Sequence, residues 1–197
     1  MAGLTRVGVS VFEIKRMSRN ESALLDALDN KHLAGDTVVV RIGRNGLELD
    51  FRAGRQSDWL SPLPDAYRRP DAKTLIAGTD GAAYYAWDET KLIGQAVAAK
   101  HEFRFAKVCD IRVSLSERKK GVGRALIEAL ERWAWQQGYS GITAETQDNN
   151  PGACQFFLKC GYRFGGVDMF RYAALPERIG TPDSLREAAM LFYKLFK

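Results

Sequence analysis

The sequence predicts an α+β fold, with a mixed and mostly antiparallel central sheet flanked by helices. Two pairs of apolar runs, each joined by a short turn sequence, indicate antiparallel hairpins. Between residues 110 and 162 the pattern changes to strand, glycine loop, amphipathic helix, strand and helix. Hairpins beside such a strand–helix–strand unit are typical of a mixed sheet.

The first fifty residues predict a strand, a helix and a hairpin. Residues 7–14 alternate apolar and polar side chains, as a half-buried strand does. Ser18 and Glu21 have the spacing of a capping box, which predicts that a helix begins there. Residues 38–42 and 47–51 lie on either side of an Asn-Gly turn, which is a strong hairpin signal.

The middle of the chain predicts a loop and then a second hairpin. From residue 54 to residue 73 the periodicity is lost and three prolines occur, which indicates an ordered loop or a plain connector. Residues 82–87 and 92–99 are apolar runs on either side of a turn at residues 88–90, so they predict a hairpin. A β-branched run at residues 108–113 predicts the next strand.

The last third of the chain predicts two helices and further strands. Apolar side chains recur at helical spacing over residues 122–137, and residues 141–146 indicate a strand. Asn150 followed by Pro151 is typical of a helix start, and Gly161 of a helix end. The final predicted elements are strands at residues 162–172 and 190–196, although Ser184 and Glu187 have the spacing of a helix cap.

Composition excludes some classes of function. The 197 residues suit a single domain, and no apolar run is long enough to span a membrane or to act as a signal peptide. We therefore expect a cytoplasmic protein with no membrane partner. The net charge of +5 is nearly accounted for by four cations at residues 118–124, so nucleic acid ranks low as a partner. Three cysteines and two histidines show no metal-ligand spacing, which predicts buried thiols and no metal site.

Residues 118–124 form an R-x-x-G-x-G turn that ends a strand and opens a helix. Its backbone N–H groups would point one way, at the positive end of a helix dipole, where a diphosphate binds well. A glycine turn with solvated charges is the alternative, but the strand before it and the helix after it favour a phosphate loop. The spacing matches neither a P-loop nor a dinucleotide-binding fingerprint.

This loop, together with residues 110–113 before it and 124–126 after it, resembles the acetyl-CoA-binding motif of the GNAT family of N-acetyltransferases. Residues 145–150 and 153–162 resemble the second half of that core, and in particular the streptothricin acetyltransferase branch. Residues 166–168 and 189–193 also resemble that branch. The resemblance implies one N-acetyltransferase domain over residues 1–197. Residues 1–81 are its divergent part, 82–172 its acetyl-CoA-binding core and 173–197 a C-terminal segment, where the resemblance favours a strand.

The resemblance also implies how acetyl-CoA is held. The strands at residues 108–113 and 141–146 would form a splayed parallel pair, with pantetheine bonded to the backbone of the first strand and pyrophosphate on the loop. Asn150 matches a family position near the cofactor and is equally well explained as an ordinary helix cap. The implied cofactor-binding residues are Ile111, Val113, Arg118, Lys119, Gly121, Val122, Gly123, Arg124 and Asn150.

Acetyl transfer needs a neutral amine, a polarised carbonyl and a proton for the departing thiolate. Glu145, at the end of the second strand, is the first candidate for the base, and Asp110 is the second. Asp110 shares a strand face with Arg112, so a structural ion pair is the better explanation of it. Phe157 stands where the family usually has the tyrosine presumed to protonate the thiolate, which leaves the general acid open.

We therefore expect an enzyme that moves acetyl from acetyl-CoA to a primary amine. Streptothricin or a similar small molecule is the sharper prediction, which would make the protein an antibiotic-resistance determinant. A protein lysine or an N-terminal amine is the alternative acceptor. A CoA-binding sensor without transferase activity would be consistent with Phe157. Monomer and homodimer both remain open. Tyr84, Tyr85 and Trp87 are explained better as core aromatics than as an acceptor pocket.

Overall fold

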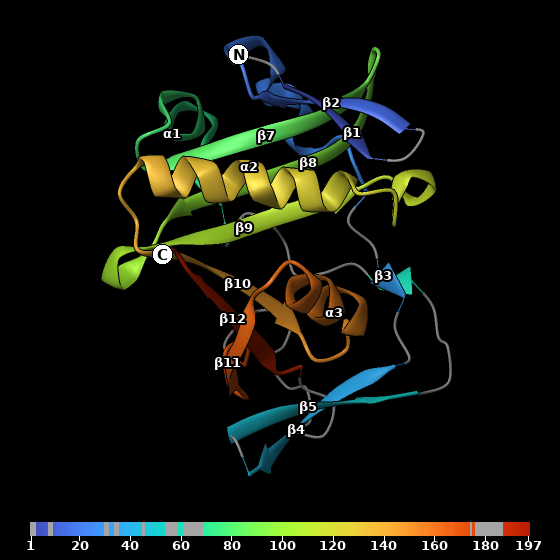
Figure 1. The fold of residues 1–197 in the computed structure, drawn as a ribbon, viewed down its shortest axis with the longest axis vertical. Coiled ribbons are helices and arrows are strands. Elements are labelled where there is room, and N and C mark those ends of the chain that lie inside the picture. The colour runs from blue at the N-terminus through green and yellow to red at the C-terminus, as the bar shows by residue number, and fades with distance from the viewer. Residues whose placement is uncertain are drawn as a thin grey trace. The chain divides into compact units, whose positions relative to one another are not determined.

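The computed structural model describes residues 3–7, 10–29, 32–33, 36–44, 46–53, 59–60, 69–173, 175 and 187–197. The chain divides into two compact units, which we treat separately (Figure 1). Unit 1 consists of Met1–Asn30, Leu63–Ile142 and Leu195–Lys197. Unit 2 consists of Lys31–Pro62 and Thr143–Lys194. The helices of the described residues include none long and apolar enough to cross a membrane.

Unit 1 is built on five antiparallel strands in the order β1-β2-β7-β8-β9. Their bounds are Gly3–Val7 (β1), Ser10–Arg16 (β2), Gly81–Asp88 (β7), Lys91–Lys100 (β8) and Phe105–Val113 (β9). The hairpin predicted at residues 82–99 and the strand predicted at 108–113 are confirmed. The single strand predicted at residues 7–14 is wrong in its bounds, because β1 ends at Val7 and β2 begins at Ser10. The apolar alternation of the sequence continues from the end of β1 into β2, so the sequence did not show that there are two strands.

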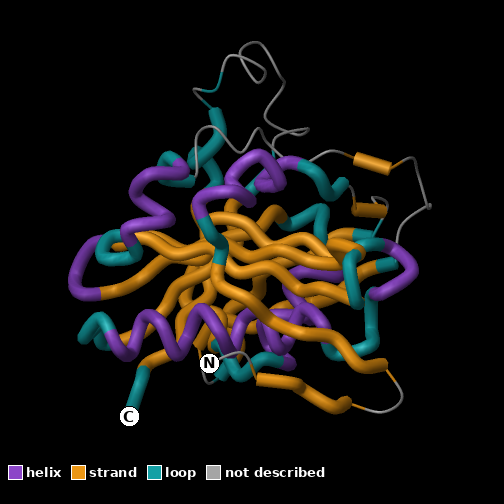
Figure 2. Tube along the Cα trace, turned by 90° about the horizontal axis from the view of Figure 1, so that it is seen from above, coloured by secondary structure: helices purple, strands orange, loops and turns teal. Residues whose placement is uncertain are grey.

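Helices cover both faces of these strands, as Figure 2 also shows. On one face α2 (Val122–Gln136) packs so closely on Gly94 that a Cβ there would lie 3.0 Å from the side chains of Val122 and Leu126. Gln95, the next residue along β8, points to the opposite face and bonds a carbonyl of the 3-10 helix η1 (Arg19–Asp26). The helix predicted at residues 122–137 is therefore confirmed and lies against the middle of the sheet.

Two local elements of unit 1 differ from expectation. The capping-box pattern does start a helix, since the Glu21 carboxylate accepts from the backbone N–H of Ser18 at 2.8 Å. That helix, η1, is a 3-10 helix rather than an α-helix. The loop predicted at residues 54–73 ends earlier than expected, because α1 (Ala72–Ala77) begins within it and buries Leu75 completely. Six residues are too few for a helical period to be visible in the sequence. Much of that loop lies outside the described residues.

Most of β10 (Gly141–Gln147) belongs to unit 2, whose second segment begins at Thr143. Unit 2 also contains the antiparallel pair β11 (Arg163–Asp168) and β12 (Ala189–Leu195). The helix α3 (Pro151–Lys159) follows β10. A two-stranded hairpin joins β4 (Thr37–Gly43) to β5 (Gly46–Arg52), and a shorter pair joins β3 (His32–Leu33) to β6 (Trp59–Leu60). The core of unit 2 includes Phe157, which packs against Tyr162 and Phe192.

The predicted elements of unit 2 are confirmed with one correction. The hairpin, the strand at 141–146, the helix after Asn150 and the C-terminal strand are all present, while the Asn of the hairpin turn and Ser184 lie outside the described residues. The strand predicted at residues 162–172 is too long, since β11 ends at Asp168. The Asp168 side chain there accepts from the N–H of Phe170 at 2.9 Å and so turns the chain. The predicted fold class, α+β with a mixed sheet flanked by helices, is confirmed.

Candidate functional site

The loop between β9 and α2 exposes the first N–H groups of the helix. A short 3-10 helix, η4 (Leu115–Glu117), follows β9 and leads into the loop. Lys119 and Gly121 both have left-handed backbone angles, with φ of 62° and 91°. Gly121 is the N-cap of α2 and has no side chain with which to satisfy the helix start. The N–H of Ala125 donates to the carbonyl of Gly121 at 3.0 Å, as in the first hydrogen-bonded turn of a helix, and the first N–H groups of a helix point out of its N-terminal end.

The positively charged side chains of this loop differ in their contacts and in their exposure to solvent. Arg118 folds back, and its Nε donates to the carbonyl of Val113 at 3.1 Å, while burial lowers the pKa of its guanidinium. Lys120 pairs with Glu117 at 3.1 Å, and that hydrogen bond lowers the pKa of the Glu117 carboxyl. Arg124 is exposed and lies 3.9 Å from Glu128, one turn along α2. The loop therefore combines the N-terminus of a helix that has no side-chain cap with an excess of positive charge, which suits a diphosphate.

Strand β9 carries a β-bulge just before the predicted pantetheine positions. Val97 pairs with Asp110 and Ala98 pairs with Val108, so Cys109 is the extra residue. Ile111 and Val113, beyond the bulge, keep antiparallel register with β8. Bulges of this kind redirect a strand and are common beside active sites. The structure thus brings Ile111, Val113 and the loop of residues 118–124 together in unit 1.

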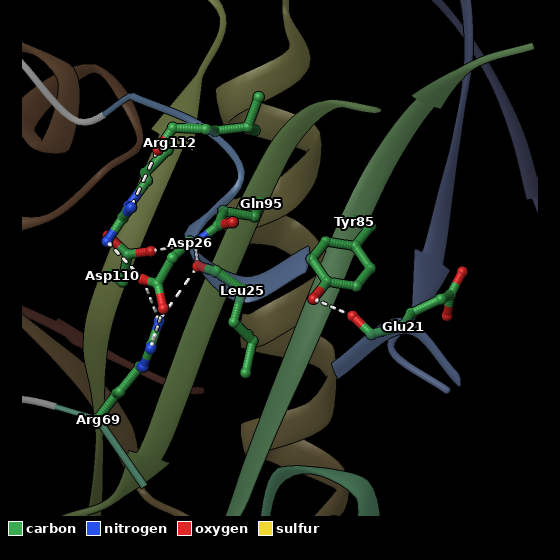
Figure 3. Close-up of polar contacts among 9 residues, drawn as sticks. Glu21, Leu25, Asp26, Arg69, Tyr85, Gln95, Asp110 and Arg112 are labelled. Atoms are coloured by element: carbon green, nitrogen blue, oxygen red, sulfur yellow. Dashed lines mark hydrogen bonds and ion pairs between the residues drawn. The ribbon is translucent and has the colours of Figure 1, made fainter. Parts of the chain in front are cut away.

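Asp110 lies in a buried polar network rather than at an open surface (Figure 3). Its carboxylate accepts from Arg112 Nε at 3.0 Å and from Gln95 Nε2, and the side chains of Asp110 and Arg112 are 6% and 5% exposed. Gln95 Nε2 also donates to the carbonyl of Leu25 at 2.7 Å, and Arg112 Nη1 to that of Leu28 at 3.0 Å. The network therefore fastens η1 and the residues after it to β8 and β9.

A second ion pair extends this network. Arg69 donates to both carboxylate oxygens of Asp26, at 3.0 and 2.6 Å, and this hydrogen bonding lowers the pKa of Asp26. Arg69 also donates to the carbonyl of Leu25, so it ties η1 to the chain that leads into α1. These contacts agree with the structural explanation of Asp110. A catalytic role for Asp110 stays a prediction.

Glu145 lies in unit 2, on β10, and its side chain is only 6% exposed. Tyr172 Oη donates to Glu145 Oε1 at 2.9 Å, and Arg171 Nη2 lies 3.3 Å from Oε2. Both partners follow β11 and are 27 and 26 residues away in the sequence. The sequence analysis did not identify Tyr172 as a functional residue. It placed Tyr172 only at the end of a predicted strand, and no local pattern indicated that its partner is Glu145.

Asn150 and Phe157 occupy structural positions in α3. Asn150 Oδ1 accepts from the N–H of Ala153 at 3.1 Å, as an N-cap does, which leaves a cofactor contact a prediction. Phe157 is 3% exposed among the aromatic side chains of unit 2. Before α3, Asp148 accepts from the N–H of Ala188 at 3.1 Å, and burial raises the pKa of its carboxyl. Within α3, burial raises the pKa of the Cys154 thiol to about 12, so that thiol is unreactive at neutral pH.

Tyr85 belongs to the core of unit 1, which agrees with its prediction as a core aromatic residue. It is fully buried, and its hydroxyl donates to the carbonyl of Glu21 at 3.0 Å (Figure 3). Its ring meets that of Trp87 edge to face, with centroids 6.2 Å apart. Cys109, also buried, belongs to the same core cluster.

Comparison with known proteins identifies the family. A sequence model described as the acetyltransferase (GNAT) family matches residues 49–162, which include parts of both units. The streptothricin acetyltransferase of Escherichia coli is 33% identical over 153 residues, which are 78% of this chain and 82% of that protein. Streptothricin acetyltransferase A of Bacillus subtilis strain 168 is 33% identical over 136 residues, or 68% and 75% of the two chains.

A solved structure agrees at the level of the fold. A Bacillus anthracis protein, described as a candidate streptothricin acetyltransferase and crystallised with acetyl coenzyme A, has a TM-score of 0.78. It is 24% identical, and the match covers 96% of this chain and 100% of that one. With the family model matching more than half of the chain, and with relatives a third identical over most of their length, the protein belongs to the GNAT family of acetyltransferases.

Proposed function

We propose that this protein transfers the acetyl group of acetyl-CoA to a primary amine of streptothricin or of a similar small-molecule antibiotic. The relatives named as streptothricin acetyltransferases support this choice of acceptor over a protein lysine or an N-terminal amine. The transfer would inactivate an antibiotic that reaches the cytoplasm, where acetyl-CoA is made. Both units would then serve one catalytic domain.

The observation that carries the proposal is the start of α2. The left-handed Gly121 leaves the N–H groups of the first turn without a side-chain cap. Coenzyme A presents a diphosphate, and the amides of residues 119–124 with the Arg124 guanidinium suit it in charge and in donor number. Arg118 would act indirectly, because it holds the end of β9 against the loop.

Glu145 is our candidate for the general base. An alkylammonium has a pKa of about 10.4, so removing its proton near pH 7 costs roughly 4–5 kcal/mol. A nearly buried carboxylate, acting directly or through water, can accept that proton as the amine attacks. Asp110 is the second candidate, but its ion pair with Arg112 makes it the weaker one.

The remaining groups of the reaction are the oxyanion donor and the general acid. A backbone N–H beside Ile111, next to the bulge in β9, would stabilise the developing oxyanion. Phe157 is a buried apolar side chain, so the thiolate takes its proton from water or from another group. Acetyl-CoA supplies the activated acyl group. The side chains of this protein bind it, orient the amine and move the proton.

The test is a thiol-release assay with acetyl-CoA and a panel of amines that includes streptothricin, a lysine peptide and an N-terminal peptide. We expect turnover with streptothricin, and a fall in kcat of about 10²–10⁴-fold in Glu145→Gln. Full activity in Glu145→Gln would remove Glu145 as the base. Binding of acetyl-CoA without turnover of any amine would instead support the CoA-binding sensor.

A further inference from the structure

The carboxylate of Glu145 is held by side chains from the segment after β11. Tyr172 donates its hydroxyl to one oxygen at 2.9 Å, and the Arg171 guanidinium lies 3.3 Å from the other. All three residues belong to unit 2. The two contacts together define the plane and the rotation of the carboxylate.

The two contacts differ in their surroundings. Tyr172 is 5% exposed and the Glu145 side chain 6%, so their hydrogen bond is shielded from water. Arg171 is 45% exposed, and its ion pair is therefore weakened by solvent and by salt. A hydrogen bond to an ionised carboxylate stabilises the ionised form, and it does so more strongly where water is excluded. Tyr172 should thus control Glu145 more than Arg171 does.

We propose that Tyr172 is a positioning residue for Glu145. Its hydroxyl holds the carboxylate in one orientation and keeps it ionised, which is the state that can accept a proton from the acceptor. This inference rests on the proposed function, in which Glu145 is the base.

The proton balance of the step is simple. The ammonium proton of the acceptor passes to Glu145, and the nitrogen lone pair forms a bond to the thioester carbonyl carbon. The carbon–sulfur bond then breaks while the nitrogen gives up its second proton to solvent and the departing thiolate takes a proton from solvent. The products are a neutral amide and the thiol of coenzyme A, with the first proton on Glu145. Tyr172 keeps its own proton throughout, and its hydrogen bond to Glu145 weakens as the carboxylate becomes neutral.

Tyr172→Phe tests the inference because it keeps the buried ring and removes only the hydroxyl. In this variant we expect the acidic limb of the kcat/KM profile to move to higher pH by about one unit, since the ionised carboxylate has lost a donor. At pH values on the acidic limb, the kcat/KM of Tyr172→Phe should be about tenfold lower than that of the wild-type protein. Affinity for acetyl-CoA should stay unchanged, since Tyr172 acts through Glu145.

Two comparison variants sharpen the result. Tyr162→Phe is the matched control: it removes a hydroxyl from another buried tyrosine of unit 2, whose ring packs against Phe157, and should leave the profile in place. Arg171→Gln should move the limb in the same direction by a smaller amount. An unmoved limb in Tyr172→Phe, while Glu145→Gln is inactive, would overturn this inference alone. Full activity in Glu145→Gln would overturn the base assignment itself.

A measurement on the wild-type protein covers the case in which Tyr172→Phe does not fold. With tyrosine labelled by ¹³C at Cζ, one ring signal should titrate with the midpoint of the acidic limb. In Glu145→Gln that titration should disappear. If no tyrosine signal follows the limb, or if the titration persists in Glu145→Gln, the coupling between Tyr172 and Glu145 is refuted.

Discussion

Replacing Asp110 by alanine separates a structural role from a catalytic one. The carboxylate of Asp110 accepts from Arg112 and from Gln95, and its surroundings are almost closed to solvent. Without it, the Arg112 guanidinium stays buried while its nearest opposite charge is gone. Asp26 lies 3.7 Å from Arg112 with a side chain 63% exposed, so it compensates only in part. Asp29 also attracts the Arg112 guanidinium.

The expected cost follows from these contacts. Removing one partner of a buried ion pair typically costs 3–5 kcal/mol, because an uncompensated charge remains in the interior. Arg112 keeps its hydrogen bond to the carbonyl of Leu28, so we expect a loss near the lower end, about 3 kcal/mol. That is a large fraction of the 5–15 kcal/mol that typically stabilises a folded protein.

Urea unfolding followed by far-UV circular dichroism measures this cost. With a denaturant slope of about 1–3 kcal/mol/M, the midpoint should fall by roughly 1–3 M in Asp110→Ala. Replacing both charges by leucine, in Asp110→Leu/Arg112→Leu, should restore much of the loss, since no buried charge is then left unpaired. The control is Asp50→Ala, which breaks exposed ion pairs with Arg41 and Arg52 and should barely change the midpoint.

Two outcomes would refute this reasoning. A midpoint in Asp110→Ala as high as that of Asp50→Ala would show that the buried ion pair contributes little to stability. A double variant no more stable than Asp110→Ala would show that the cost does not come from the uncompensated charge. A stable, well-folded Asp110→Ala protein with no activity would favour the catalytic alternative instead.

Two further predictions concern the phosphate loop and a buried acid. Gly121→Ala forces a side chain onto a φ of 91°, at a cost of about 1–2 kcal/mol, and should weaken coenzyme A binding about tenfold as the amides turn away. The control is Gly138→Ala, because Gly138 has a φ of 78° and lies beyond the other end of α2. It should lose similar stability but keep its affinity for coenzyme A, as measured by calorimetry. Equal losses of affinity in the two variants would contradict our placement of the diphosphate. Burial raises the pKa of Asp148, so the folded state binds its proton more tightly than the unfolded state, and the ionised form costs stability at neutral pH. Asp148→Asn should therefore raise the free energy of unfolding at pH 7, and the gain should shrink as the pH falls toward 3.8; a gain independent of pH would show that ionisation is not the cause.

The backbone form of the loop at residues 118–124, which we propose binds the diphosphate, was predictable because its signals are local. The glycine spacing, the strand before it and the apolar period of α2 all lie within about thirty residues, and each reflects the backbone preferences of neighbours. Asn150 was recognisable as a cap for the same reason, since a cap bonds a backbone N–H three residues away. The amphipathic helix and both longer hairpins follow from equally short-range patterns.

The environments of the two acids were not predictable in the same way. The sequence placed Asp110 and Arg112 on one strand face, but the Gln95 and Leu28 contacts that fasten η1 depend on strands and turns brought together by folding. Tyr172 reaches Glu145 across 27 residues, and no local rule links the two.

The sequence by itself determined the order of most of the longer elements, the family and the loop that suits a diphosphate, because local backbone preferences and short motifs encode these. Only the tertiary structure decided which distant segments enclose Asp110 and which tyrosine holds Glu145. The physical reason is that burial and hydrogen-bond partners, which set the chemistry of an acid, arise from packing between segments distant along the chain.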